Sequence, residues 1–256
     1  MKSFLAFLKK DVTEQWRCRR VMIIGIIFAA FGIMNAGFAK LTPLLLEATE
    51  DMLAASGMSL QVQPATAVDS WLQFFANIPM ALIAFVLIQG GAFTREYKSG
   101  TLVLSLTKGL DRYKVIFSKT IVLFSSWTYG YFLCFGVNYL ANVCLWTPAG
   151  ASHLLFATFS WWLFGIWVIA LMILFSVLSS SQTGVFLGTG GVVFGLYMIS
   201  IIPKIGKFLP TYAAGGGALI YGTAEPKTYV ISLCIAFACT VACIGASIPL
   251  FNKKQL

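Results

Sequence analysis

Long apolar stretches, separated by short polar segments, dominate the chain. They occupy residues 21–39, 78–93, 115–146, 154–178, 183–202 and 229–251. An α-helix needs about 20 consecutive, mostly apolar residues to cross the hydrocarbon core of a bilayer. The pattern therefore predicts six membrane-spanning helices. The third stretch is long enough for its first turns to emerge from the bilayer after a cap at Asp111.

One charged side chain, Lys119, falls inside these stretches. It lies near the start of the third stretch, and the aliphatic stem of a lysine can carry its ammonium group to the membrane interface. We therefore expect Lys119 to reach out of the hydrocarbon region.

Residues 4–21 repeat apolar side chains at helical spacing, at Phe4, Leu8, Val12 and Trp16. This spacing predicts a helix lying in the headgroup plane before the first span. A cytoplasmic extension of the first span is the alternative.

Residues 42–56 have the pattern of another amphipathic helix outside the membrane. Thr42 would be its cap and Pro43 would lie in its first turn.

The segment between the second and third stretches, residues 94–112, is the most informative part of the chain. It reads TREYKSGTLVLSLTKGLDR. Its apolar residues trace one face of a short helix: Leu102, Val103, Leu106 and Leu110. We expect such a helix to press on another surface.

The composition agrees with a membrane protein. Hydrophobic residues make up 59% of the chain and charged residues 11%, and the mean hydropathy is +0.84. A soluble core cannot bury so many apolar side chains, so the bilayer must act as solvent. The expected fold is one all-α, polytopic membrane domain over residues 1–256.

Loop charges predict the orientation of the spans. Residues 1–20 and 94–119 each carry six bases against two acids, and the positive-inside rule places both segments in the cytoplasm. The acidic loop 40–70 is then external, and both termini are cytoplasmic. The fifth connection is an exception, because it is basic although the span count places it outside, with Lys204, Lys207 and Lys227 against Glu225. The formal net charge of +9 follows from topology and contact with anionic lipid, and does not indicate nucleic-acid binding.

The segment 94–112 resembles the membrane subunit of ABC-2 type transporters, in which an Arg-Glu-x-x-x-Gly-Thr pattern follows the second of six spans. Here the pattern is Arg95-Glu96-Tyr97-Lys98-Ser99-Gly100-Thr101. Gly109 stands where the family commonly has a proline, and either residue makes a turn. The resemblance extends over most of the chain, because the six-span layout and the N-terminal helix also match.

In that family the segment is a cytoplasmic coupling helix that docks into a groove of a separate ABC ATPase. The resemblance, with the residue types present, implies this role for Arg95, Glu96, Lys98, Gly100, Thr101, Leu102, Val103 and Leu106. The apolar side chains would fill the groove, the charged ones would line its rim, and Gly100 would allow a sharp turn after the span. The resemblance also implies an extracellular re-entrant segment at residues 203–228.

The implied assembly contains two membrane subunits, identical or paralogous, and two ATPase subunits that bind ATP and Mg²⁺. This chain has no phosphate-binding loop of its own, because its one Gly-Lys pair, Gly206-Lys207, is followed by Phe208. Its single histidine, His153, and six cysteines without Cys-x-x-Cys spacing indicate no catalytic set and no metal site. We expect no cofactor in this chain and no enzymatic activity.

Small residues in two spans allow helices to approach closely. The first span contains Gly25 and Gly32, and the fifth contains Gly184, Gly188, Gly191 and Gly195. These stripes pack either within one subunit or across a dimer. The resemblance implies a dimer axis near both spans.

Polar side chains inside the spans are candidates for a substrate path: Gln89, Tyr131, Asn138 and Asn142. Asn138 and Asn142 are four positions apart and share one helical face. A polar strip facing a cavity and hydrogen bonds between helices both explain them.

The resemblance leads us to expect the permease subunit of an ATP-driven exporter, working by alternating access in the bacterial cytoplasmic membrane. The apolar, aromatic spans favour a hydrophobic or amphipathic substrate, such as an antimicrobial or phenol-soluble-modulin peptide. The alternative is a membrane immunity or sensor protein for a bacteriocin or antibiotic. That alternative predicts no ATPase partner.

Overall fold

The computed structural model describes residues 2–54, 64–107, 109–146 and 151–254, and within them every regular element is a helix. In chain order the elements are α1 (Lys2–Arg17), α2 (Arg20–Ala54), α3 (Ala67–Gln89), α4 (Thr94–Ser99), α5 (Thr101–Thr107), α6 (Arg112–Leu145), α7 (Leu154–Leu178), α8 (Gln182–Ser200), α9 (Pro203–Gly206), the 3₁₀ helix η1 (Pro210–Ala214), α10 (Gly216–Ile220) and α11 (Lys227–Lys253). Six helices are long and apolar enough to cross a membrane: α2, α3, α6, α7, α8 and α11, with the span that begins with α3 running on through α4. The predicted all-α fold with six spans is confirmed.

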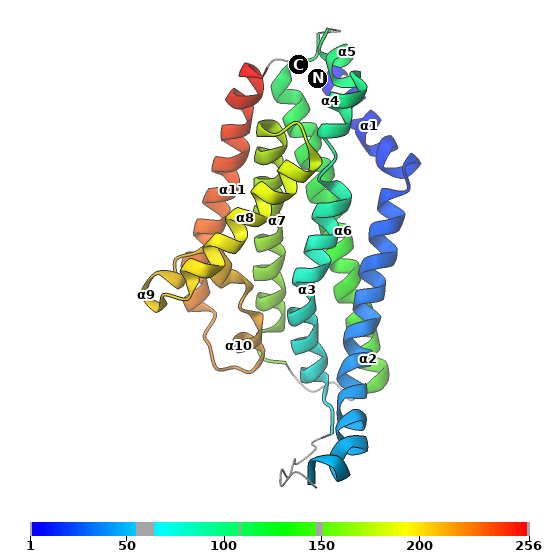
Figure 1. Cartoon of the computed structure of the whole chain (residues 1–256), viewed down its shortest axis with the longest axis vertical. Coiled ribbons are helices and arrows are strands. Elements are labelled where there is room, and N and C mark those ends of the chain that lie inside the picture. The colour runs from blue at the N-terminus through cyan, green and yellow to red at the C-terminus, as the bar shows by residue number, and fades with distance from the viewer. Residues whose placement is uncertain (1, 55–63, 108, 147–150, 255–256) are drawn as a thin grey trace.

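The spans form an elongated bundle with α7 at its centre (Figure 1). α7 packs against α6, α8 and α11, and α2 packs against α3 and α6. Gly165 allows the close approach of α6, because a Cβ at this position would lie 2.2 Å from the ring of Trp127. The Trp127 indole then donates to the carbonyl oxygen of Trp162 at 3.2 Å. α8 is the least buried span, and it slopes away from the bundle.

Both termini, α4 and α5 lie at the same end of the bundle (Figure 1). We call this the motif end and the opposite one the far end. An even number of spans requires the two termini to share a side, as the loop charges predict.

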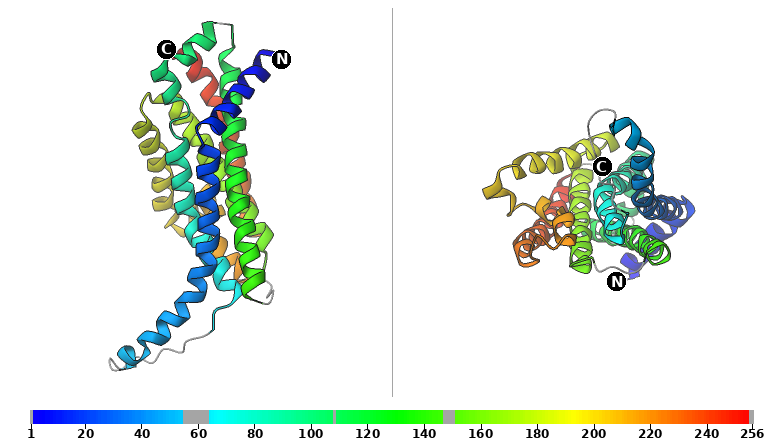
Figure 2. Two further views of the ribbon diagram at one scale, coloured as in Figure 1. Left: turned by 90° about the vertical axis from the view of Figure 1, so that its right-hand side faces the viewer. Right: turned by 90° about the horizontal axis from the view of Figure 1, so that it is seen from below.

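α1 is a helix of its own and does not extend the first span. The helical conformation is interrupted between α1 and α2 at Cys18 and Arg19, and Arg19 has a left-handed φ of 56°. α1 therefore leaves the axis of α2 at an angle (Figure 2). Its position in the headgroup plane stays a prediction.

The prediction of a separate helix over residues 42–56 is wrong for the residues that the structure describes there. α2 continues through Pro43 to Ala54, and the Thr42 hydroxyl donates back to the carbonyl oxygen of Phe38 at 2.7 Å without capping a new helix. At 1.5 Å per residue, the 35 residues of α2 span roughly 52 Å, which exceeds the ~30 Å apolar thickness of a bilayer. The end of α2 therefore projects beyond the bundle (Figure 2). Residues 55 and 56 lie outside the described ranges.

The segment between α8 and α11 folds back against the far end. α10 packs against α3 and α7, where Gly216 faces the ring of Phe75. The Tyr229 hydroxyl donates to the carbonyl oxygen of Gly215 at 2.9 Å, and the rings of Tyr212 and Tyr229 stack at 4.6 Å. A re-entrant segment needs this kind of cover from protein, but its position in the bilayer stays a prediction.

Candidate functional site

The motif of residues 94–112 forms two short helices where the sequence predicted one. Gly100 separates α4 from α5 in the left-handed conformation, with φ 67°, which glycine adopts without steric strain. α5 ends at Thr107, before Leu110, and Gly109 makes a second left-handed turn with φ 84°. Lys108 lies outside the described residues.

Glu96 of α4 is buried inside the chain, 3% exposed, and does not lie on the expected rim of a groove. Its Oε1 accepts hydrogen bonds from Nζ of Lys10 in α1 at 2.6 Å and from Nζ of Lys119 in α6 at 2.9 Å. The motif carboxylate therefore joins three helices of its own chain.

Lys119 is also buried, at 5% exposed, so its ammonium group meets side chains of its own chain; its position at the membrane interface stays a prediction. Its Nζ donates to Oδ1 of Asp11 at 3.0 Å, in addition to Glu96. The Ser118 hydroxyl donates to the other oxygen of Asp11 at 2.8 Å. Burial raises the pKa of the Asp11 carboxyl, against the attraction of Lys119. A buried charge needs paired partners to offset its desolvation. Asp11 of α1 is one such partner for Lys119.

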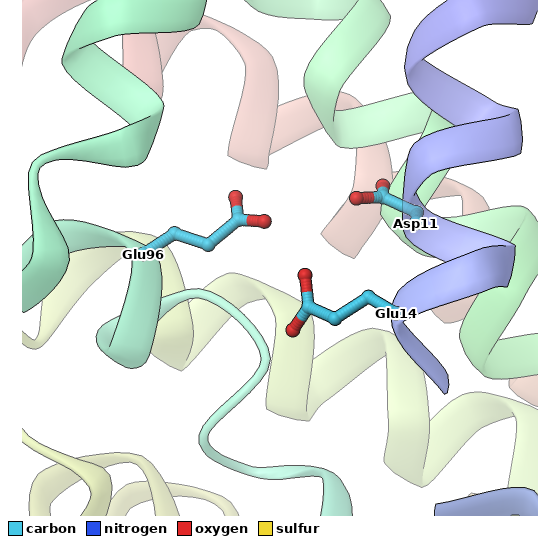
Figure 3. Close-up of side chains that lie close together, drawn as sticks. All are labelled: Asp11, Glu14 and Glu96. Carbon is cyan, nitrogen blue, oxygen red and sulfur yellow. The ribbon is translucent and has the colours of Figure 1, made fainter. Parts of the chain in front are cut away.

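We call Lys10, Asp11, Glu96 and Lys119 the ion cluster; it balances two cations against two carboxylates. Figure 3 shows Asp11 and Glu14 of α1 pointing toward Glu96 of α4. One carboxylate oxygen of each of these three side chains lies within 4.8 Å of the other two. Each acid pairs with a cation of the same chain: Asp11 and Glu96 with those of the ion cluster, and Glu14 with Arg20 at 3.4 Å.

Next to the ion cluster, two amide side chains pair α1 with the end of α3. Gln15 and Gln89 exchange hydrogen bonds of 3.2 and 3.1 Å, and both are buried. The structure thus places Gln89, a candidate for the substrate path, in a contact between helices.

Three cations at the motif end cap the C-termini of α3, α7 and α11. Arg95 donates to the carbonyl oxygens of Ile88 and Gly91, each at 3.1 Å. Arg112 donates to Phe251, Asn252 and Lys254 carbonyls at 2.7, 3.0 and 2.8 Å. Lys254 donates to Val177 and Ser179 carbonyls at 2.7 and 3.3 Å. Cations at these ends complement the negative end of each helix dipole.

Lys254 also contacts α4, at Tyr97. Its ammonium lies over the ring of Tyr97, 4.3 Å from the centroid. Burial lowers the pKa of Lys254, because it disfavours the charged form of the ammonium group. α4 is thus held between the ion cluster and the chain's C-terminal residues.

The apolar face of α5 is divided between the chain and the surface. Leu102 is fully buried within the chain, which corrects the expectation that it would fill a partner's groove. Val103 and Leu104 are 38% and 58% exposed, and Leu106 is half-buried. Lys98 and Thr101 lie at the exposed surface beside them. A hollow of about 490 Å³ opens along Val103, Leu106, Thr107, Leu110, Asp111 and Arg112.

The other candidates for a substrate path hold helices together. Ser70 of α3 donates to Oδ1 of Asn138 at 3.2 Å and accepts from Nδ2 of Asn142 at 3.0 Å. The Tyr131 hydroxyl donates to the carbonyl oxygen of Thr158 in α7 at 2.9 Å. Of the two interpretations of Asn138 and Asn142, this geometry favours hydrogen bonding between helices.

Two apolar grooves lie elsewhere on the bundle. One, of about 1050 Å³, lies between α6, α7 and α11, and the other, of about 290 Å³, lies between α3, α7 and α8. Among the described residues, aromatic and aliphatic side chains make most of both linings, and none of the four polar candidates belongs to either.

The glycine stripes divide into packed and open positions. A Cβ at Gly25 would lie 2.8 Å from the Tyr129 hydroxyl, and one at Gly32 would lie 2.8 Å from the Cys134 carbonyl oxygen. In α8, Gly184 and Gly188 similarly face Ser179 and Phe175, whereas Gly191 and Gly195 have no described atom within 4 Å of a built Cβ. Four of the six glycines thus meet their own chain, and two are open.

Six spans, two short helices at one end and an ion cluster that joins them to the bundle define a multi-span membrane component. The chain belongs to the ABC-2 family of transporter proteins, since the model of that family, described as ABC-2 family transporter protein, matches residues 5–215. Among curated proteins, none matches the chain significantly. Membership agrees with the resemblance of the motif and implies an ABC ATPase as partner.

Proposed function

We propose that this chain is the membrane-spanning permease subunit of an ATP-driven exporter and that α5 is its coupling helix. One observation carries the proposal: α5 exposes Val103 and Leu104 at the surface of the motif end, while α4 beside it is held by ion pairs of buried Glu96, one with buried Lys119 and one with half-buried Lys10. An exposed apolar patch on a rigid support is the usual anchor of a protein interface.

The separate ATPase would bind ATP and Mg²⁺ and would move α5 when its own subunits close. Both termini, α4 and α5 are then cytoplasmic, in a bacterial cytoplasmic membrane. A second copy or a paralogous permease would complete the pathway, packing on the open glycines Gly191 and Gly195 of α8. The two apolar grooves suit a hydrophobic or amphipathic substrate, with a peptide favoured.

The test is purification of the tagged chain from its host in mild detergent, with wild type, Leu104→Asp and Leu104→Met compared. We expect a soluble ATPase with phosphate-binding motifs to co-purify with wild type and Leu104→Met, and to be lost from Leu104→Asp. Leu104 suits this test because it is exposed, whereas a charge at buried Leu102 would disturb the chain's own core. Absence of any such ATPase from wild type contradicts the proposal and favours the immunity or sensor alternative.

A further inference from the structure

α4 is too short to hold its own position. A helix of six residues is unstable in isolation, so its tertiary contacts fix it. On the side of the ion cluster, Glu96 meets Lys119 of α6 at 2.9 Å and Lys10 of α1 at 2.6 Å.

α4 is also joined to its own span, through the buried turn of residues 90–93 between α3 and α4. Arg95 of α4 donates across this turn to the carbonyl oxygens of Ile88 and Gly91, each at 3.1 Å. α4 therefore contacts α3 through a hydrogen-bonded turn, and α6 and α1 through ion pairs. Separating Glu96 from Lys119 would leave each of these buried groups with one charged partner instead of two, in a region of low dielectric.

From the two ion pairs of Lys119, with Asp11 of α1 and with Glu96 of α4, we infer that Lys119 is a positioning residue that makes α4, α6 and α1 move as one body. Movement of α5 then enters the membrane through α6 and α1 as well as through α3. This inference rests on the proposed function, because it assigns a route to the movement that the ATPase drives.

The test uses a charge-balanced variant, since Lys119→Met alone would take from buried Asp11 its closer cation and leave only Lys10 at 3.8 Å. Asp11→Asn with Lys119→Met removes one charge of each sign and keeps the pair of Glu96 with Lys10. Glu14→Gln with Arg20→Gln is the matched control, because it also removes one charge of each sign but breaks a contact between α1 and α2. Lys119→Arg keeps the cation.

The readout is hydrogen exchange of the co-purified complex in nanodiscs, with ATP hydrolysis measured in parallel, before and after the ATPase is closed with ATP and vanadate. We expect closure to change exchange in residues 112–120 and in α1 of wild type, Lys119→Arg and the control pair. In Asp11→Asn/Lys119→Met this response is lost from residues 112–120, while α1, which keeps its pair with Glu96 through Lys10, and α5 still respond and ATP hydrolysis continues. A response of wild-type size in residues 112–120 of that variant overturns the inference. Failure of the proposed function is a separate result, because no ATPase would then co-purify with wild type.

Discussion

The Lys119 ammonium of α6 lies 2.9 Å from the Glu96 carboxylate of α4, and both groups are buried. Glu96, the acid of the Arg-Glu-x-x-x-Gly-Thr motif, therefore pairs with a lysine of its own chain, 23 positions further along the sequence. This pair places the motif helices relative to the third span. For this reason we propose the exposed face of α5, rather than Glu96, as the surface for a partner.

Glu96→Gln should lower stability, because it leaves Lys10 without its close carboxylate and Lys119 with only Asp11. Breaking a buried ion pair from one side costs about 3 kcal/mol, so the purified protein should melt at a lower temperature in detergent. Glu47→Gln, at an exposed position of α2, is the control. Equal melting temperatures for both variants would contradict the ion cluster.

Gly165→Ala should destabilise the contact between α6 and α7, since its Cβ would stand 2.2 Å from the Trp127 ring. Overpacking of this kind costs about 1–3 kcal/mol. Gly136→Ala and Gly245→Ala are matched controls in spans, because no described atom lies within 4 Å of their built Cβ atoms. Thermal unfolding should separate Gly165→Ala from both controls, and three equal curves would be inconsistent with this contact.

Gly191→Leu and Gly195→Leu should weaken self-association without unfolding the subunit. Both positions are open in the single chain, and a bulky side chain there prevents close helix approach in lipid. Single-molecule photobleaching in nanodiscs measures the fraction of dimers, with Gly37→Leu of α2, also open, as control. An unchanged dimer fraction would exclude this face of α8 from the interface.

Arg112→Gln should loosen the end of α11, because three carbonyl oxygens lose their cap. The expected cost is about 1–2 kcal/mol, seen as faster hydrogen exchange in residues 250–254. The exchange rate of these residues in Arg112→Lys should lie between the rates of Arg112→Gln and wild type. A lysine keeps the charge but cannot reproduce the guanidinium geometry. Exchange rates that match wild type in Arg112→Gln would show that the cap is unimportant.

The number of spans could be predicted because each apolar stretch is long enough to cross a bilayer, and no packing detail changes that requirement. The turn at Gly100 was also predictable from the residue type. The continuity of α2 through Pro43 was not, because the pattern of residues 42–56 fits a new helix as well as a continued one.

The ion cluster was not predicted from the sequence, because a lysine near the start of an apolar stretch fits a position at the membrane interface. The same lysine is also compatible with a buried ionic partner, and residues 1–20 and 94–119 contain four acids: Asp11, Glu14, Glu96 and Asp111. Which of them pairs with Lys119 depends on how α1 crosses α6, a contact between segments more than 100 positions apart. Which apolar residues of α5 are buried in the chain also depends on tertiary contacts. The sequence does not decide this, because an apolar helix face fits the chain's own core as well as a partner.

The most direct test of the central claim is crosslinking from a cysteine at position 104 in native membranes. Leu104→Cys places a reactive group on the exposed face of α5, and Leu155→Cys places one at the far end of α7 with 77% of the native side chain exposed. We expect mass spectrometry to find a crosslink from position 104 to an ABC ATPase and none from position 155. No ATPase crosslink at position 104, or equal crosslinking at both positions, would contradict the assignment of α5 as the coupling helix.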